Sequence, residues 1–104
     1  MILNDFDCIS WHDSVISSFA IDFDNSSIFL KLNAYENIES NNKVNVFLNI
    51  YGVDFLSSHF DFNELNDNCK SGNISNAYIK NEKIYIYFVD GFLSIRFRKF
   101  EIII

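Results

Sequence analysis

The chain has 104 residues, of which 49% are hydrophobic and 17% are aromatic, and its formal net charge is −6. This length fits a single domain over residues 1–104, which can bury enough apolar surface to fold without a metal or a disulfide. The acidic balance disfavours binding to nucleic acid or to anionic lipid, and it favours a basic protein partner.

The first half of the chain contains three segments in which apolar and polar residues alternate, as they do in half-buried strands. These segments are residues 15–23, residues 28–34 and residues 43–51. Strict alternation in the first segment places Ser17 and Phe19 on the same face. Polar residues separate the three segments, so we expect an antiparallel meander with one buried face.

The middle of the chain, residues 52–72, has no clean period, and residues 62–69 are compatible with a short helical turn. Alternation returns in residues 74–80, 83–89 and 92–100, which predict three more strands.

Turn-forming residues separate these last strands. Asn81 and Glu82 are expected to form a tight hairpin, and Asp90 and Gly91 can both take the positive φ of a type I′ turn. The apolar tail at residues 102–104 must be packed, as the end of the last strand. The predicted fold is mainly β: an antiparallel sandwich or partly open barrel of about six to seven strands, with at most one short helix.

Few residues have side chains suited to catalysis or metal binding. Cys8, His12 and Asp13 contain the groups of a nucleophilic set, but nothing in their spacing makes them face one another. His12, His59, Cys8 and Cys69 carry zinc-ligand atoms without the spacing of a known zinc motif. We therefore expect no enzyme activity, no cofactor and no bound metal.

The basic residues near the C-terminus could suggest nucleic-acid binding. Arg96 and Arg98 alternate with Ile95 and Phe97, as on the two faces of one strand, and Lys99 follows them. This arrangement favours a solvated strand face, and the overall negative charge opposes binding of a polyanion.

The two cysteines, Cys8 and Cys69, are too few for a disulfide framework and are typical of a reducing compartment. The acidic start is unlike a secretory leader, and no apolar run reaches the roughly 20 residues of a membrane span. We expect a cytoplasmic protein that is not in a membrane.

The segment Trp11-His12-Asp13-Ser14 precedes the first predicted strand. Asp13 or Ser14 can close a turn with its side-chain oxygen, while Trp11 plugs one end of the core.

This segment, the strand end at residues 47–53 and the Asp90-Gly91 hairpin together resemble small bacterial immunity proteins of contact-dependent growth-inhibition and other polymorphic toxin systems. The resemblance implies that the protein binds and neutralises the C-terminal domain of a cognate toxin, often a nuclease, in the cytoplasm of the producing cell. It implies no catalytic residue.

A binding surface for such a basic partner follows from the predicted meander. The first and third strands end at the same edge of the sheet, which places Asp24 near Asp54, and the irregular segment after Asp54 carries further acids. Tyr51 or Phe55 could serve as an aromatic anchor. The predicted partner-binding residues are Asp24, Asp54, Phe55, Asp61, Glu64 and Asp67.

A second function is compatible with the same sequence. An exposed edge at residues 102–104 would invite pairing with another copy of the chain, so the alternative is a small structural or assembly β domain that forms a homodimer.

Overall fold

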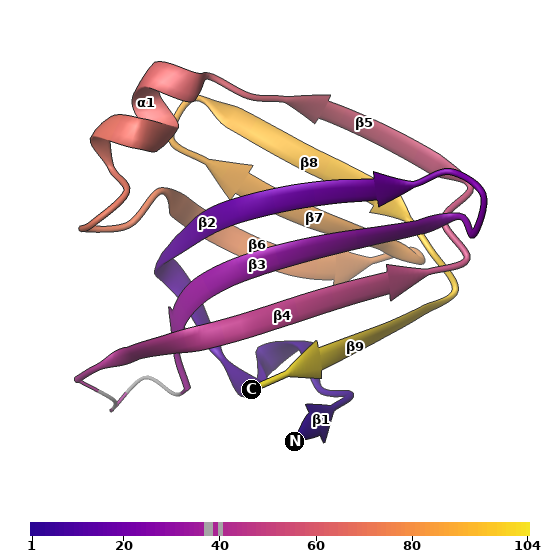
Figure 1. The fold of residues 1–104 in the computed structure, drawn as a ribbon, viewed down its shortest axis with the longest axis horizontal. Coiled ribbons are helices and arrows are strands. Elements are labelled where there is room, and N and C mark those ends of the chain that lie inside the picture. The colour runs from indigo at the N-terminus through magenta and orange to yellow at the C-terminus, as the bar shows by residue number, and fades with distance from the viewer. Residues whose placement is uncertain (37–38, 40) are drawn as a thin grey trace.

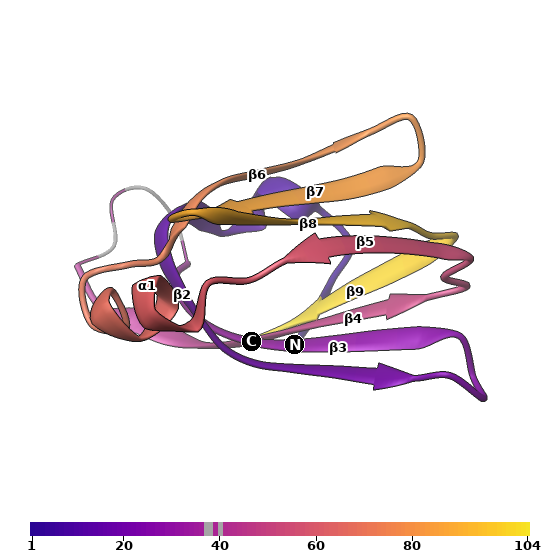
Figure 2. The same ribbon diagram turned by 90° about the horizontal axis from the view of Figure 1, so that it is seen from above.

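The computed structural model describes residues 1–36, 39 and 41–104, and this part of the chain forms two antiparallel sheets packed as a sandwich (Figures 1 and 2). The five-stranded sheet has the order β1-β9-β4-β3-β2, and the four-stranded sheet has the order β5-β8-β7-β6. The sheets do not close into a barrel, and the predicted β-sandwich class with one short helix is confirmed. The elements are β1 (Ile2–Leu3), a 3-10 turn (Phe6–Cys8), β2 (Ser10–Asp22), β3 (Ser27–Tyr35), β4 (Lys43–Tyr51), β5 (Phe55–His59), α1 (Phe62–Asp67), β6 (Ile74–Lys80), β7 (Lys83–Phe88), β8 (Gly91–Arg96) and β9 (Lys99–Ile103).

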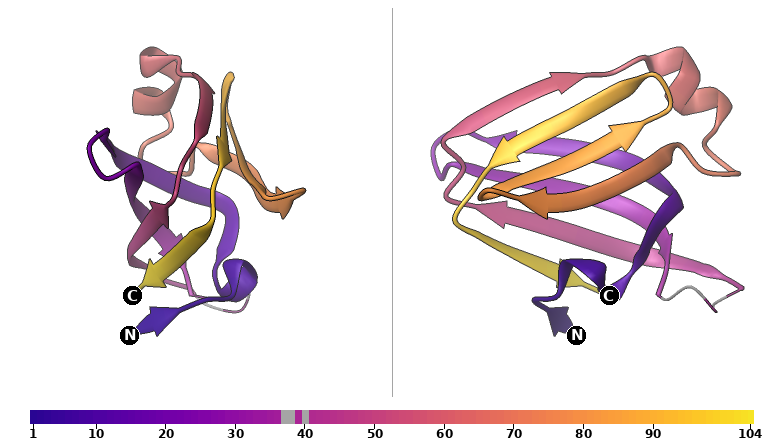
Figure 3. Two further views of the ribbon diagram at one scale, coloured as in Figure 1. Left: turned by 90° about the vertical axis from the view of Figure 1, so that its right-hand side faces the viewer. Right: turned by 180° about the vertical axis from the view of Figure 1, so that it is seen from behind.

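The described residues form nine strands, where the sequence indicated about six to seven. β1 and β5 are short and lack an alternating pattern. The segment 92–100, expected as one strand, is divided at Phe97 and Arg98, where the chain leaves the four-stranded sheet and enters the other (Figure 3). Alternation continues from Ile95 to Arg98, and the corner is marked in the sequence only by the consecutive basic residues Arg98 and Lys99.

The C-terminal strand lies inside the five-stranded sheet. Ile102 pairs with Leu3 of β1 and with Leu48 of β4, and Ile102 is fully buried. The apolar tail is thus packed, as expected. Residues 102 and 103 are therefore not an exposed edge. The predicted self-association depended on such an edge, so it loses its interface.

β2 contains a register shift that strict alternation did not predict. Ile16 is opposite Leu32, but Ser18 is opposite Lys31, so Ser17 is the extra residue of a bulge. Residues directly opposite each other share a face, so Ile16 and the residues after the bulge at positions 19 and 21 face inward. Ser17 does not share this face with Phe19, and its hydroxyl donates to the carbonyl oxygen of Lys31.

Two hairpin turns connect the strands of the four-stranded sheet. Asn81 and Glu82 both have positive φ, 53° and 64°, which confirms the expected tight turn. The next turn is shifted from its predicted position, because Gly91 already pairs with Phe88 and only Asp90 has a positive φ. Gly91 serves another purpose: a Cβ at this position would collide with the carbonyl oxygen of His59 on the neighbouring strand.

Trp11 closes one end of the core, as the sequence suggested. Its indole is buried, stacks on Phe6 at 4.5 Å between ring centroids, and donates from Nε1 to the carbonyl oxygen of Phe6 at 2.7 Å. Asp13 has a φ of 66°, and the Ser14 hydroxyl donates to the Ser10 carbonyl oxygen across this irregularity. Ser14, rather than Asp13, therefore supplies the side-chain hydrogen bond at this bend.

Replacing Gly72 with alanine is expected to lower the free energy of unfolding by about 2–4 kcal/mol. Gly72 has a φ of 135°, and a Cβ there would lie 2.5 Å from the carbonyl oxygen of Asp13. Urea denaturation monitored by Trp11 fluorescence measures the change. Ser71→Ala, at the adjacent exposed position, is the control, and an equal effect of the two substitutions would contradict this account.

Candidate functional site

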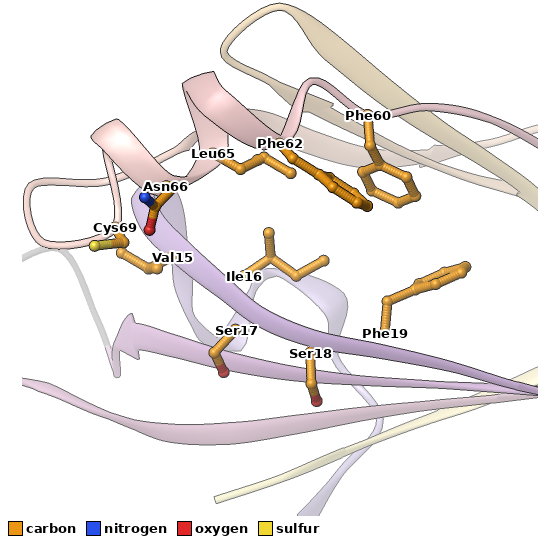
Figure 4. Close-up of a pocket in the computed structure, with 10 residues that line it drawn as sticks. All are labelled: Val15, Ile16, Ser17, Ser18, Phe19, Phe60, Phe62, Leu65, Asn66 and Cys69. Atoms are coloured by element: carbon orange, nitrogen blue, oxygen red, sulfur yellow. The ribbon is translucent and has the colours of Figure 1, made fainter.

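An open cleft of about 670 Å³ separates the second half of β2 from the segment that runs from β5 through α1 (Figure 4). Ile16 and Phe19 point into it from β2, and Phe60, Phe62 and Leu65 face them from the other wall. The Phe19 and Phe60 rings are 5.4 Å apart in an edge-to-face arrangement. The complete lining is Val15, Ile16, Ser17, Ser18, Phe19, Phe60, Phe62, Leu65, Asn66 and Cys69.

A smaller hollow of about 200 Å³ lies at the other end of the same side, between the β2–β3 turn and the start of β5. The amide of Val53 donates to the carbonyl oxygen of Ser26 at 2.9 Å and holds these two connections together. Phe23 and Phe55 both line this hollow, and their exposed fractions are 84% and 57%. Phe62, at the larger cleft, is 79% exposed.

The two hollows therefore share one side of the sandwich, between the edge strands β2 and β5, which is seen from above in Figure 2. We call it the β2–β5 face. It comprises the residues that line the two hollows together with the acidic residues of the same segments, Asp22, Asp24, Asp54, Asp61, Glu64 and Asp67.

The acidic side chains of this face have different local partners. Asp54 accepts from Arg96 Nε at 2.8 Å, and this hydrogen bond lowers the pKa of the Asp54 carboxyl. Hydrogen bonds from Asn25 lower the pKa of Asp22. Asp61 caps α1 by accepting from the backbone N–H of Glu64 at 3.1 Å. These hydrogen bonds favour the ionised form of both carboxyls, and Arg96 balances the charge of Asp54 locally.

The six predicted partner-binding residues lie along this one side, but in two groups. Asp24, Asp54 and Phe55 are at the hairpin end, where the expected proximity of the first and third strand ends is seen. Asp61, Glu64 and Asp67 are at the α1 end, with β5 between the groups (Figure 1).

The two aromatic anchors considered from the sequence differ in their surroundings. Phe55 is exposed on the β2–β5 face, whereas Tyr51 packs edge-to-face against Phe29 and lies under the Lys99 ammonium. The exposed rings of Phe23 and Phe62 were missed. Phe23 seemed to continue a buried strand face, and the segment around Phe62 has no regular period, so neither pattern indicated exposure.

Asn73, which the sequence did not single out, fixes one end of the cleft. It is 1% exposed, its Oδ1 accepts from the Ile16 N–H at 2.9 Å, and its Nδ2 donates to the Leu65 carbonyl oxygen at 3.1 Å. Its own N–H donates to the Ser14 carbonyl oxygen, and its carbonyl oxygen accepts from the Val89 N–H. The side chain and backbone of this one buried residue thus link β2, α1 and the β7–β8 turn.

Another group of aromatic side chains, Tyr78, Tyr85 and Tyr87, lies on paired strands of the four-stranded sheet. The Tyr78 ring stacks on Tyr85 at 5.2 Å and on Tyr87 at 6.0 Å. These rings contact one another across the strands, which is how aromatic pairs stabilise a sheet. Their partial exposure therefore has a structural explanation that the separate rings of Phe23, Phe55 and Phe62 lack.

The residues considered for catalysis and metal binding are not gathered into one site. His12 Nδ1 is 3.0 Å from the Ser75 carbonyl oxygen, and the hollow that His12 lines does not include Cys8. Cys69 lines the cleft of the β2–β5 face instead. Within residues 1–36, 39 and 41–104, no three His, Cys, Asp or Glu side chains are placed to hold a metal ion.

The basic residues 96–99 follow the predicted strand faces. Ile95 is fully buried, while Arg96 and Arg98 are exposed, and Arg96 is paired with Asp54. Lys99 lies 3.4 Å from a Glu101 carboxylate oxygen.

The two thiols are expected to differ in reactivity at neutral pH. Partial burial, reinforced by the charges of Asp5 and Asp7, raises the pKa of Cys8, whereas Cys69 is exposed beside the cleft. Because the thiolate is the reacting form, Cys69 should be labelled by a disulfide reagent well before Cys8. Mass spectrometry of partly labelled protein measures the order, with Cys8→Ser and Cys69→Ser as controls. Faster labelling of Cys8 would contradict the structure.

No helix in the described part of the chain is both long enough and apolar enough to cross a membrane. Comparison of the chain with protein-family models, with curated proteins and with solved structures finds no match. The function must therefore be inferred from the chemistry of the β2–β5 face.

Proposed function

We propose that this protein is an immunity protein, which binds a basic toxin domain through the β2–β5 face and thereby neutralises it. The observation that carries the proposal is the exposure of Phe23, Phe55 and Phe62 beside the hollows of this one face. Large exposed apolar side chains that gather on one side of a protein, beside apolar hollows, are typical of interaction sites. Aromatic side chains in or beside pockets are also the commonest anchors of protein interfaces.

The charge of the face favours a cationic partner. Asp24, Asp54 and Asp67 are exposed at its two ends, and among the residues that the structure describes Arg96 is the only cation in an ion pair with one of them. A nuclease has a basic surface because it holds phosphates, so an acidic protein can occupy that surface in place of nucleic acid. Complementary charge also accelerates encounter and disfavours wrong partners. The free thiols Cys8 and Cys69 suit action in the cytoplasm.

The proposal is tested by co-expressing the chain with the protein encoded beside it and purifying the complex. We expect a 1:1 complex with a basic domain, together with rescue of growth when that domain is toxic. Recovery of the chain without such a domain, and with no rescue of growth, would reject the immunity function. Recovery as a homodimer would favour self-association through a surface other than the C-terminal strand.

A further inference from the structure

The β2–β5 face is bordered by two strands that each have a free edge. Among the strands of the described residues, β2 pairs only with β3 and β5 pairs only with β8, so both are edge strands of their sheets. The cleft lies between β2 and the residues that follow β5, from Phe60 to Cys69, and its walls carry apolar side chains (Figure 4). The start of β5 borders the smaller hollow. Edge strands present unpaired backbone N–H and C=O groups, which can pair with another chain.

Part of the β2 edge is already occupied. Asn73 accepts from the Ile16 N–H and donates to the Ser14 carbonyl oxygen, which lie on the side away from β3. Beyond the bulge at Ser17, residues 18–22 pair with β3 in regular register. Backbone groups alternate in direction along an antiparallel strand, so every other residue of 18–22 directs its N–H and C=O away from β3.

Residues 18–21 of this edge lack the features that protect natural edge strands. Charged side chains, proline and bulges usually prevent pairing with a foreign strand. Residues 18–21 are Ser, Phe, Ala and Ile, with no charge and no proline, and the bulge precedes them. Residues 55–58 at the facing edge, Phe, Leu, Ser and Ser, are also uncharged.

We infer that the β2–β5 face binds an extended segment of its basic partner, which adds as a strand to the β2 edge at residues 18–22. Its alternate apolar side chains enter the cleft toward Phe19 and Phe60, and its Lys or Arg residues lie toward its ends. At about 3.3 Å per residue, five to six residues of such a segment match the free edge. This inference rests on the proposed function and specifies how the partner is recognised.

Charge selects this occupant over a second copy of the chain. Asp22 and Asp24 lie at one end of the free edge, and Asp61, Glu64 and Asp67 lie at the end near α1. A basic strand meets opposite charges at both ends. A second β2 would instead bring its own Asp22 and Asp24 into this acidic surface, and like charges at an interface are unfavourable.

The test uses a synthetic eight-residue peptide of alternating Lys and Val, labelled for fluorescence anisotropy. The control peptide is identical but is N-methylated on two adjacent central residues, which removes one amide donor from each edge of the strand. We expect the control to bind at least tenfold more weakly. We also expect the unmethylated peptide to slow amide hydrogen exchange within residues 18–22 at least tenfold.

A matched pair of variants tests the same site from the protein side. Ile21→Lys adds a charge on the inward side of β2, beside the smaller hollow, and Ala20→Lys adds it on the outer side of the same strand. Peptide binding should weaken at least tenfold for Ile21→Lys and less than threefold for Ala20→Lys, with circular dichroism confirming that both fold. If Ile21→Lys fails to fold, the comparison of the two peptides decides.

Equal binding of the two peptides, no binding of either, or binding without protection of residues 18–22 would overturn strand addition. Dimerisation of the free chain with these amides protected would overturn it in favour of a second copy. The proposed function fails separately, if the co-expressed partner forms no complex.

Discussion

Replacing Asn73 with alanine is expected to lower the free energy of unfolding by about 3 kcal/mol. The substitution leaves the Ile16 N–H and the Leu65 carbonyl oxygen without their partner, at a position where the amide is 1% exposed. Each buried polar group that loses its hydrogen bond costs about 1–3 kcal/mol. For a domain of this size, the loss corresponds to a fall in Tm of roughly 12–24 °C.

Asn68→Ala is the matched control for this prediction. Asn68 also donates from its side-chain amide, to the Glu64 carbonyl oxygen, but this bond lies within one turn at the end of α1. The Asn68→Ala substitution should lower the free energy of unfolding by less than about 1.5 kcal/mol, because a single hydrogen bond contributes about 0.5–1.5 kcal/mol net. Chemical denaturation of both variants measures the difference. A cost below 1 kcal/mol for Asn73→Ala would mean that the amide does not hold the two walls of the cleft together.

Reversing three exposed charges of the β2–β5 face, in the variant Asp24→Lys, Asp54→Lys and Asp67→Lys, is expected to weaken partner binding by about 100-fold. Much of the loss should appear in the association rate, and it should shrink as salt rises from low to high concentration. None of these three carboxylates caps the described helix, whose cap is Asp61. Asp54→Lys breaks the ion pair with Arg96, but an exposed ion pair contributes only about 0–1 kcal/mol, so the variant should still fold like the parent chain.

The matched control reverses three charges away from this face, in the variant Asp7→Lys, Glu36→Lys and Glu82→Lys. It changes the net charge equally, so it separates a local effect from the general loss of acidity. Affinity should fall less than about tenfold, since charges beyond a Debye length are largely screened. Surface plasmon resonance with the purified basic partner measures both variants. Equal losses would show that total charge, and not this face, drives binding.

The sequence predicted those parts of the fold that depend on local pattern. Alternation identified the six longer strands, and Trp11 was correctly placed at the end of the core. Alternation did not reveal the division of the last predicted strand at Phe97 and Arg98, because it runs up to Arg98 and two consecutive basic residues do not by themselves indicate a change of sheet. The bulge at Ser17 was hidden for a related reason, since one inserted residue shifts the period without interrupting it.

The candidate site was predicted in part. The two connections that carry Asp24 and Asp54 are adjacent, because this follows from any antiparallel meander. The apolar cleft at the other end of the face depends on how the α1 segment packs beside β2, which no local pattern specifies. Asn73 illustrates the same limit: its bonds to Ile16 and Leu65 join segments 57 and 8 residues away.

The central claim, that the β2–β5 face binds the partner, is tested most directly by the hydrogen-exchange footprint of the purified 1:1 complex. We predict protection of residues 17–23 and 55–67, with no change at Tyr78, Tyr85 and Tyr87 on β6 and β7. Protection confined to β6 and β7, or to the outer face of β3 and β4, would contradict the account.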